Sequence, residues 1–169
     1  MTEREGDRVE LIDGVAYVTP APRPVHQFIA QNLNRLLDRH IQAGKLGQLA
    51  TAPVDVRLSE TDVVQPDLLF ISQARLSIAG DVAIEGAPDL AVEILSPGTR
   101  GRDLGAKRDL YARAGVREYW LIDPVAGTIA MLTLRDGRYE AIPADAAGAF
   151  HSALLPGLVV DPPAVFDLD

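Results

Sequence analysis

Residues 87–124, with the sequence APDLAVEILSPGTRGRDLGAKRDLYARAGVREYWLIDP, predict a strand, a helix and a second strand in that order. Residues 90–95 form an apolar run that contains one charged residue, Glu93. Helical periodicity follows over residues 103–114, and residues 118–122 are strand-like again. A helix between two strands of one sheet predicts a right-handed crossover, in which the two strands are parallel.

Hairpins are predicted on both sides of this central unit. Residues 9–18 form two short apolar arms around Asp13-Gly14, and residues 128–142 repeat the arrangement around Asp136-Gly137. Asp-Gly is a preferred centre for the tight turn that joins two antiparallel strands. One hairpin is therefore expected near the N-terminus and another after the central unit.

The remaining segments predict one long helix and further strands. Apolar residues recur at helical spacing over residues 25–42, whereas residues 54–58 alternate as in a half-buried strand and residues 63–71 are largely apolar. We expect one α/β domain over residues 1–169, built around a mixed β-sheet. The tail beyond Pro156 carries residues that can pack onto it: Leu158, Val159, Val165 and Phe166.

Composition excludes several classes of protein and of site. The chain has no cysteine, which rules out disulfides, thiolate nucleophiles and cysteine-ligated zinc. It has no apolar run near the roughly 18 residues of a membrane span. The first ten residues, MTEREGDRVE, mix charges and lack the apolar core of a secretory signal. These features predict a cytoplasmic protein with no membrane association.

The charge of the chain restricts its partners. The formal net charge is −8, so the overall field does not favour nucleic acid. However, six of the sixteen Lys and Arg residues lie within residues 100–117. This basic segment is either a solvated helix surface or a local contact for phosphate groups.

Three charged residues interrupt apolar patterns. Asp67 lies within the run VVQPDLLFIS, and Glu93 lies within LAVEIL. At about 100° per residue, Lys107 falls in the middle of the apolar helical arc that contains Leu104 and Leu110. Because isolated buried charges are costly, we expect the ammonium group to point toward the sheet and its carboxylates.

Each of these residues alone is explained by a structural ion pair or by a long side chain that reaches solvent. Together they favour a site. Carboxylates can bind Mg²⁺ or Mn²⁺ through oxygen, and such a metal activates water and stabilises a phosphoryl transition state. A nearby lysine can orient the attacking water. Asp67, Glu93 and Lys107 are therefore the predicted catalytic residues of metal-assisted phosphodiester hydrolysis, with the two carboxylates as metal ligands.

These same residues carry a resemblance to a known family. Pro66-Asp67, followed by the segment from residue 87 to residue 124, resembles the Uma2 family (DUF820) of restriction-endonuclease-like proteins, which is placed in the PD-(D/E)xK nuclease superfamily. The similarity runs from Val9 to Phe166. It implies a restriction-endonuclease-like αβββαβ core with an added hairpin at each end, dependence on Mg²⁺ or Mn²⁺, and DNA as substrate. A homodimer is a further implication.

The chain departs from the superfamily motif at one position. Leu95 stands two residues beyond Glu93, where the motif has lysine, and Lys107 on the following helix takes the place to which Uma2-like chains have moved it. Glu10 corresponds to an acidic position of the family and is either a further metal ligand or an exposed strand residue. His26, in the family-like context PVHQ, is either a surface residue or part of the cleft. Candidate phosphate-binding residues are Arg100, Arg102 and Arg108.

Two other functions stay open at this point. The net charge, the absence of a lysine at position 95 and the lack of an added DNA-binding region also fit a catalytically inactive, nuclease-like binding module. A metal-dependent hydrolase of smaller phosphoesters or of single-stranded substrates fits the same residues.

Overall fold

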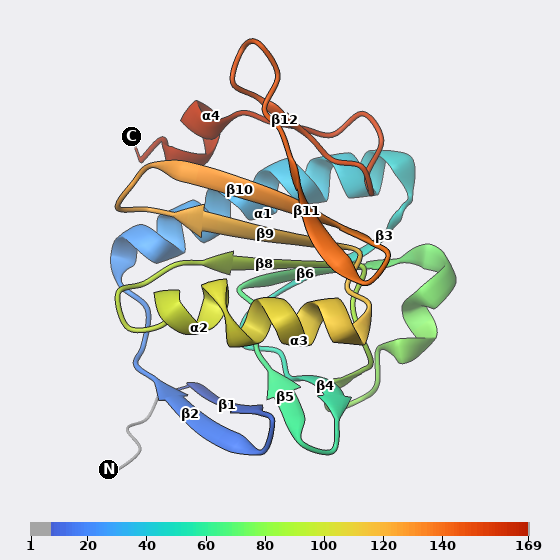
Figure 1. Cartoon of the computed structure of the whole chain (residues 1–169). Helices are drawn as coiled ribbons and strands as arrows, with labels where there is room; N and C mark the ends of the chain where they lie inside the picture. Colours follow the sequence, from blue (N-terminus) through green and yellow to red (C-terminus); the bar gives the residue numbers. More distant parts are fainter. Residues whose placement is uncertain (1–7, 169) are drawn as a thin grey trace.

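The centre of the molecule is a six-stranded mixed sheet (Figure 1). The computed structural model describes residues 8–168, so most of the charged N-terminal decapeptide lies outside the described residues. The sheet order is β11-β10-β9-β8-β6-β3, and only β8 and β9 are parallel neighbours. Its strands are β3 (Gly47–Thr51), β6 (Leu68–Ser72), β8 (Leu90–Ile94), β9 (Glu118–Asp123), β10 (Thr128–Arg135) and β11 (Arg138–Ile142).

One face of this sheet is covered by the long helix α1 (Pro24–Gly44), which lies behind the strands in Figure 1. The helix buries a stripe of residues at three- and four-residue spacing, as its sequence predicts: Ile29, Leu33, Leu37 and Ile41. Phe28, which belongs to the same apolar pattern, is instead exposed. The C-terminal segment adds to this layer through β12 (Phe150–His151), β13 (Val159–Val160) and α4 (Pro162–Phe166).

The tail packs as expected at Leu158 and Val165, which are buried, whereas Val159 is exposed. No helix in the described part of the chain is both long enough and apolar enough to cross a bilayer.

The opposite face of the sheet is covered by helices α2 (Arg100–Leu104) and α3 (Ala106–Ala114) and by a second sheet. That second sheet has the order β2-β1-β5-β4-β7 and lies at the bottom of Figure 1. Its strands are β1 (Arg8–Ile12), β2 (Val15–Thr19), β4 (Val56–Ser59), β5 (Asp62–Val64) and β7 (Ile84–Glu85). A short 3₁₀ helix, η1 (Gln73–Ile78), lies between β6 and β7.

The predicted αβββαβ core is confirmed in the order α1, β3, β6, β8, α2–α3 and β9. Both predicted hairpins are present, and their turns place Asp13 and Asp136 at positive φ, followed in each case by a glycine at positive φ. The parallel pairing of β8 with β9 sets Glu93 opposite Leu121. This pairing follows from the crossover through α2 and α3.

Three details differ from the sequence prediction. The edge strand β3 was not expected, and it begins at Gly47, where a Cβ atom would lie 2.0 Å from the carbonyl oxygen of Ile71. Residues 63–71 do not form one strand: β5 and β6 belong to different sheets, with Pro66 between them. The predicted helix over residues 103–114 is broken at Gly105, which leaves Leu104 exposed and turns Asp103 inward.

Candidate functional site

Two carboxylates lie near each other at one end of the central sheet. Leu68 of β6 pairs with Val92 of β8 in antiparallel register, and Asp67 and Glu93 are the next residues toward that end. They are near enough for the charge of Asp67 to raise the pKa of Glu93. Both are nearly inaccessible, with exposed fractions of 5% for Asp67 and 4% for Glu93.

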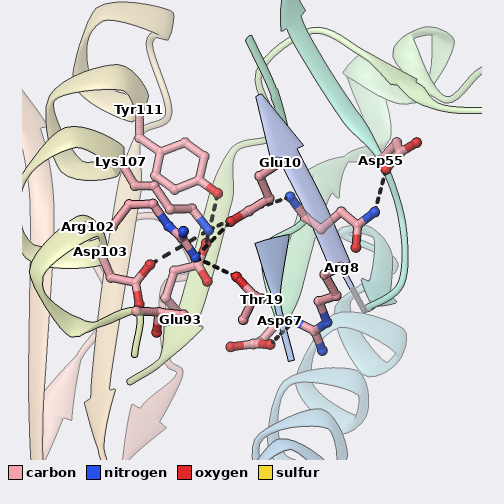
Figure 2. Close-up of polar contacts among 12 residues, drawn as sticks. Arg8, Glu10, Thr19, Asp55, Asp67, Glu93, Arg102, Asp103, Lys107 and Tyr111 are labelled. Carbon is pink, nitrogen blue, oxygen red and sulfur yellow. Dashed lines mark hydrogen bonds and ion pairs between the residues drawn. The ribbon is translucent and has the colours of Figure 1, made fainter. Parts of the chain in front are cut away.

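Lys107 reaches these strands from α3 and forms the centre of a charged cluster (Figure 2). Its Nζ lies 2.5 Å from Glu93 Oε1, 2.8 Å from Glu10 Oε1 and 3.8 Å from Asp103 Oδ1. The lysine is 1% exposed. One ammonium group is thus surrounded by three carboxyl groups that come from three different elements: β1, β8 and α2.

The charges in this cluster shift one another's ionisation. Burial acts to lower the pKa of Lys107, but the carboxylates of Glu93, Glu10 and Asp103 outweigh it and raise the pKa above its usual value. Burial raises the pKa of Glu93 well above that of an ordinary glutamate, because the charge of Lys107 offsets only part of the desolvation and the other carboxylates add to it. Lys107 therefore stays charged, while Glu93 keeps its proton to a higher pH than usual.

Asp67 has different partners. Its Oδ1 accepts a hydrogen bond of 2.7 Å from Arg8, and its Oδ2 accepts one of 2.7 Å from the backbone N–H of Ile94 and lies 3.2 Å from His26 Nε2. Burial acts to raise the pKa of Asp67, but the hydrogen bond and charge of His26 and the charge of Arg8 lower it below its usual value. Asp67 is therefore ionised, and its side-chain partners are Arg8 and His26, whereas Lys107 pairs with Glu93.

Glu10 is buried, so the alternative of an exposed strand residue is wrong. Its Oε1 accepts hydrogen bonds from Lys107 and, at 2.9 Å, from the backbone N–H of Gln65, and its Oε2 lies 3.5 Å from Arg102. Arg102 also donates to Thr19 at 2.7 Å and lies over the ring of Tyr17. These contacts fasten the N-terminal hairpin to α2 and α3, as the labelled side chains in Figure 2 show.

Tyr111 is a member of the site that the sequence did not indicate beyond a place in the core. Its hydroxyl group donates a hydrogen bond of 2.9 Å to Glu93 Oε1, the oxygen that Lys107 also contacts. Tyr111 follows Lys107 by four residues, so both side chains leave the same face of α3. That spacing is the sequence signal that would have identified it.

A cleft of about 310 Å³ opens onto these residues. His26 lines it, in agreement with the second of its two predicted placements, and is buried rather than on the surface. The charged and polar lining consists of Arg8, Glu10, Thr19, Arg23, His26, Gln65, Asp67, Glu93, Ser96, Thr99, Arg102, Asp103 and Lys107.

The three arginines predicted to bind phosphate are separated in the structure. Arg102 lines the cleft. Arg100 forms an ion pair with Asp123, and Arg108 is exposed on α3; neither is part of the cleft lining. Consecutive helical residues point in different directions, so a basic segment of sequence does not become one basic surface.

The donor set can be compared with what a divalent cation requires. Within residues 8–168, no group of three or more His, Asp or Glu side chains is arranged to hold a metal. Mg²⁺ commonly binds one or two carboxylates and completes its coordination with water and substrate phosphate. Asp67, directly before β6, and Glu93, on the neighbouring strand β8, are hard oxygen donors and fit that requirement in chemistry and number.

Comparison with known proteins agrees with this architecture. The sequence model of the Uma2 family, described as "putative restriction endonuclease", matches residues 1–163. No curated protein matches the chain. A crystal structure of "a putative nuclease belonging to DUF820" from Anabaena variabilis is similar, with a TM-score of 0.79 and 18% sequence identity over 98% of this chain and 93% of that one. The likeness shows that the two share a fold, and the family match extends over nearly the whole sequence. The chain therefore belongs to the Uma2 family of restriction-endonuclease-like proteins.

Proposed function

We propose that this protein is a divalent-metal-dependent endonuclease that hydrolyses phosphodiester bonds of DNA. The observation that supports the proposal is that Asp67 and Glu93 line one cleft, with Lys107 in contact with Glu93, in a chain of the Uma2 family. Two carboxylates and an amine are the groups that metal-assisted phosphodiester hydrolysis requires.

Each residue has a distinct role in this proposal. Asp67 and Glu93 would hold Mg²⁺ or Mn²⁺, which supplies activation of water and stabilisation of negative charge on phosphorus-bound oxygens. Lys107, which remains charged, orients the attacking water and adds positive charge near the reacting phosphate. We assign Glu10 to anchoring Lys107, because its Oε1 is engaged by Nζ and by the amide of Gln65.

The arginines of the cleft assist substrate binding in this scheme. Arg8, Arg23 and Arg102 line the cleft and supply local positive charge that a net charge of −8 does not provide. The contacts of Arg8 and His26 with Asp67, and of Arg102 with Glu10, also hold those carboxylates in place before a substrate arrives.

The direct test is cleavage of DNA by purified protein. We expect supercoiled plasmid and long single-stranded DNA to be cut in the presence of Mg²⁺ or Mn²⁺ and to stay intact in EDTA. The Asp67→Asn variant should leave both substrates intact with the metal ion and with EDTA. Cleavage in EDTA, or equal cleavage by that variant, would remove the proposed site.

One observation favours a second candidate, the catalytically inactive binding module. Glu93 and Asp67 already have cationic partners within the chain, as a purely structural ion network would. Metal binding separates the two candidates, because only a functional site gains stability from the ion.

We expect Mg²⁺ at about ten times its dissociation constant to stabilise the folded protein by about 1.4 kcal/mol. This corresponds to a rise of roughly 3–6 °C in the melting temperature. Differential scanning calorimetry of wild type and Glu93→Gln measures it, and the variant should show no rise. A flat response in wild type would favour the binding module.

The apparent affinity for the metal should depend on pH. Burial raises the pKa of Glu93, and the metal requires the ionised carboxylate, so protons compete with the ion. Affinity should therefore rise with pH from the usual glutamate range up to the raised pKa of Glu93, by up to about tenfold per pH unit, and level off above it. Titration calorimetry with Mn²⁺ between pH 5 and 8 tests this. An affinity that does not change over this range would contradict it.

A further inference from the structure

We propose that the cleft accepts an unpaired nucleotide, so that the substrate is single-stranded DNA or an unpaired segment within a duplex. This inference rests on the proposed nuclease function and adds to it the strandedness of the substrate. It is carried by the chemistry of the cleft walls, the depth of the carboxylates and the distribution of charge.

Apolar residues line much of the cleft beside its charged groups. They come from the connection between β2 and α1, from the end of β8 and from the segments that follow β8 and β9; the same segments also contribute Arg23, Ser96 and Thr99. The apolar lining consists of Pro20, Ala21, Pro22, Val25, Ile94, Leu95, Pro97, Pro124 and Val125. A phosphate group gains no hydrogen bond or ion pair from such apolar residues, whereas the faces of an unstacked base and its sugar can pack against them.

Val125 illustrates the point most clearly. It lies at the cleft with 87% of its surface exposed, two residues after the end of β9. An apolar side chain this exposed gains from a partner that covers it. In a Watson–Crick duplex the bases are stacked inside and only the sugar–phosphate backbone would meet this wall.

The dimensions of the cleft lead to the same conclusion. Its volume of about 310 Å³ is at the lower end of the range for small-molecule sites and suits one nucleotide rather than a section of double helix. Asp67 and Glu93 line the cleft and are almost fully buried. A phosphodiester must therefore enter the cleft to reach them, which a flexible single strand does at lower cost than a stiff duplex.

Charge argues against a duplex as the preferred substrate. A duplex presents two phosphate backbones and requires a broad positive surface. Here three arginines line the cleft: Arg8 and Arg102 are paired with Asp67 and Glu10, and Arg23 is exposed, so the positive surface is small. A single strand with one backbone makes a smaller electrostatic demand and gains from apolar contact with its bases.

The test compares three labelled substrates of one sequence with Mn²⁺: a single-stranded oligonucleotide, the same strand in a full duplex, and a duplex with an internal unpaired loop. We expect the single strand and the loop to be cut at least about tenfold faster than the full duplex. Equal or faster cutting of the full duplex would overturn the inference while leaving the nuclease proposal intact.

Two matched variants locate the preference in the cleft. Val125→Ser should weaken binding of the single strand by about two- to fivefold and leave duplex binding unchanged, because it removes apolar contact with bases. Val82→Ser is the control, since Val82 is also nearly fully exposed, at 89%, but lies outside the cleft lining. Equal effects of the two variants would contradict the inference.

A binding measurement makes the inference independent of catalysis. Fluorescence anisotropy of Glu93→Gln with labelled single-stranded and duplex oligonucleotides needs no turnover. Preference for the single strand without any cleavage by wild type would support the inference and reject the nuclease proposal. Preference for the duplex, or no binding to either, would reject the inference itself.

Discussion

The Lys107→Met variant is expected to lose about 3–5 kcal/mol of unfolding free energy, the cost of removing one partner from a buried ion pair. Methionine fills a similar volume, so the loss reflects charge rather than a cavity. Without the ammonium group, Glu93, Glu10 and Asp103 remain buried with no cation at the centre of the cluster. Urea denaturation at pH 7 measures the change.

Arg113→Met provides the matched control on the same helix. Arg113 pairs with Asp13 on the surface, with side-chain exposures of 54% and 64%. Its substitution should cost about 1 kcal/mol or less, because exposed ion pairs contribute little. Similar losses for the two variants would show that the cluster around Lys107 is not the stabilising feature.

The loss in Lys107→Met should depend on pH with a definite sign. Burial already raises the pKa of Glu93 and Asp103, and removal of the lysine charge raises both further. A raised pKa means that ionisation disfavours the folded state, so the variant is least stable at high pH and recovers as pH falls toward the unfolded carboxyl range. The double variant Lys107→Met/Glu93→Gln should recover part of the loss at pH 7. A loss that is the same at pH 5 and pH 8 would contradict this account.

The Glu93→Gln variant is expected to lose DNA cleavage by at least about a hundredfold while it remains folded. Glutamine preserves the shape of the side chain but lacks the charge that a divalent cation requires. Lys107 keeps Glu10 and Asp103 as anionic partners, and Tyr111 keeps an oxygen acceptor at position 93. The unfolding free energy should therefore change by no more than about 1 kcal/mol.

Asp103→Asn is the matched control for that variant. Asp103 belongs to the same cluster and is also buried, but it lies 3.8 Å from Lys107 and on α2 rather than at the strand ends. We expect it to retain cleavage within about tenfold of wild type. Initial rates on labelled DNA at saturating Mn²⁺ compare the variants. Full activity in Glu93→Gln, or an equal loss in Asp103→Asn, would remove Glu93 from its proposed role.

Elements with strong local signals were predictable from sequence. The apolar run around Glu93, the helical spacing beyond it and the two Asp-Gly turns predicted the β8–β9 crossover and both hairpins, because each depends on neighbours within a few positions. The edge strand β3 and the division of residues 63–71 between two sheets carried no such local signal. Both features are determined by which strands pair in the folded chain, and not by a pattern of neighbouring residues in the sequence.

The candidate site also has some features that the sequence predicts and others that only the folded chain decides. A charge within an apolar run singles out Asp67, Glu93 and Lys107 in the sequence, since a buried charge requires a partner. Which partner each one finds is a property of the folded chain. Arg8 and His26 reach Asp67 from positions 59 and 41 residues away, and Glu10 reaches Lys107 across 97 residues.

The sequence by itself therefore determined the order of the elements and the family. It also singled out Asp67, Glu93 and Lys107 as charges within apolar patterns, because hydrophobic periodicity and turn chemistry act over short distances along the chain. Only the tertiary structure decided that Glu10 and Tyr111 join the cluster, that Arg100 and Arg108 lie outside the cleft, and that apolar residues line the cleft together with the charged ones. Those outcomes depend on how separate elements pack, and packing brings together groups whose separation along the chain carries no information about their distance in space.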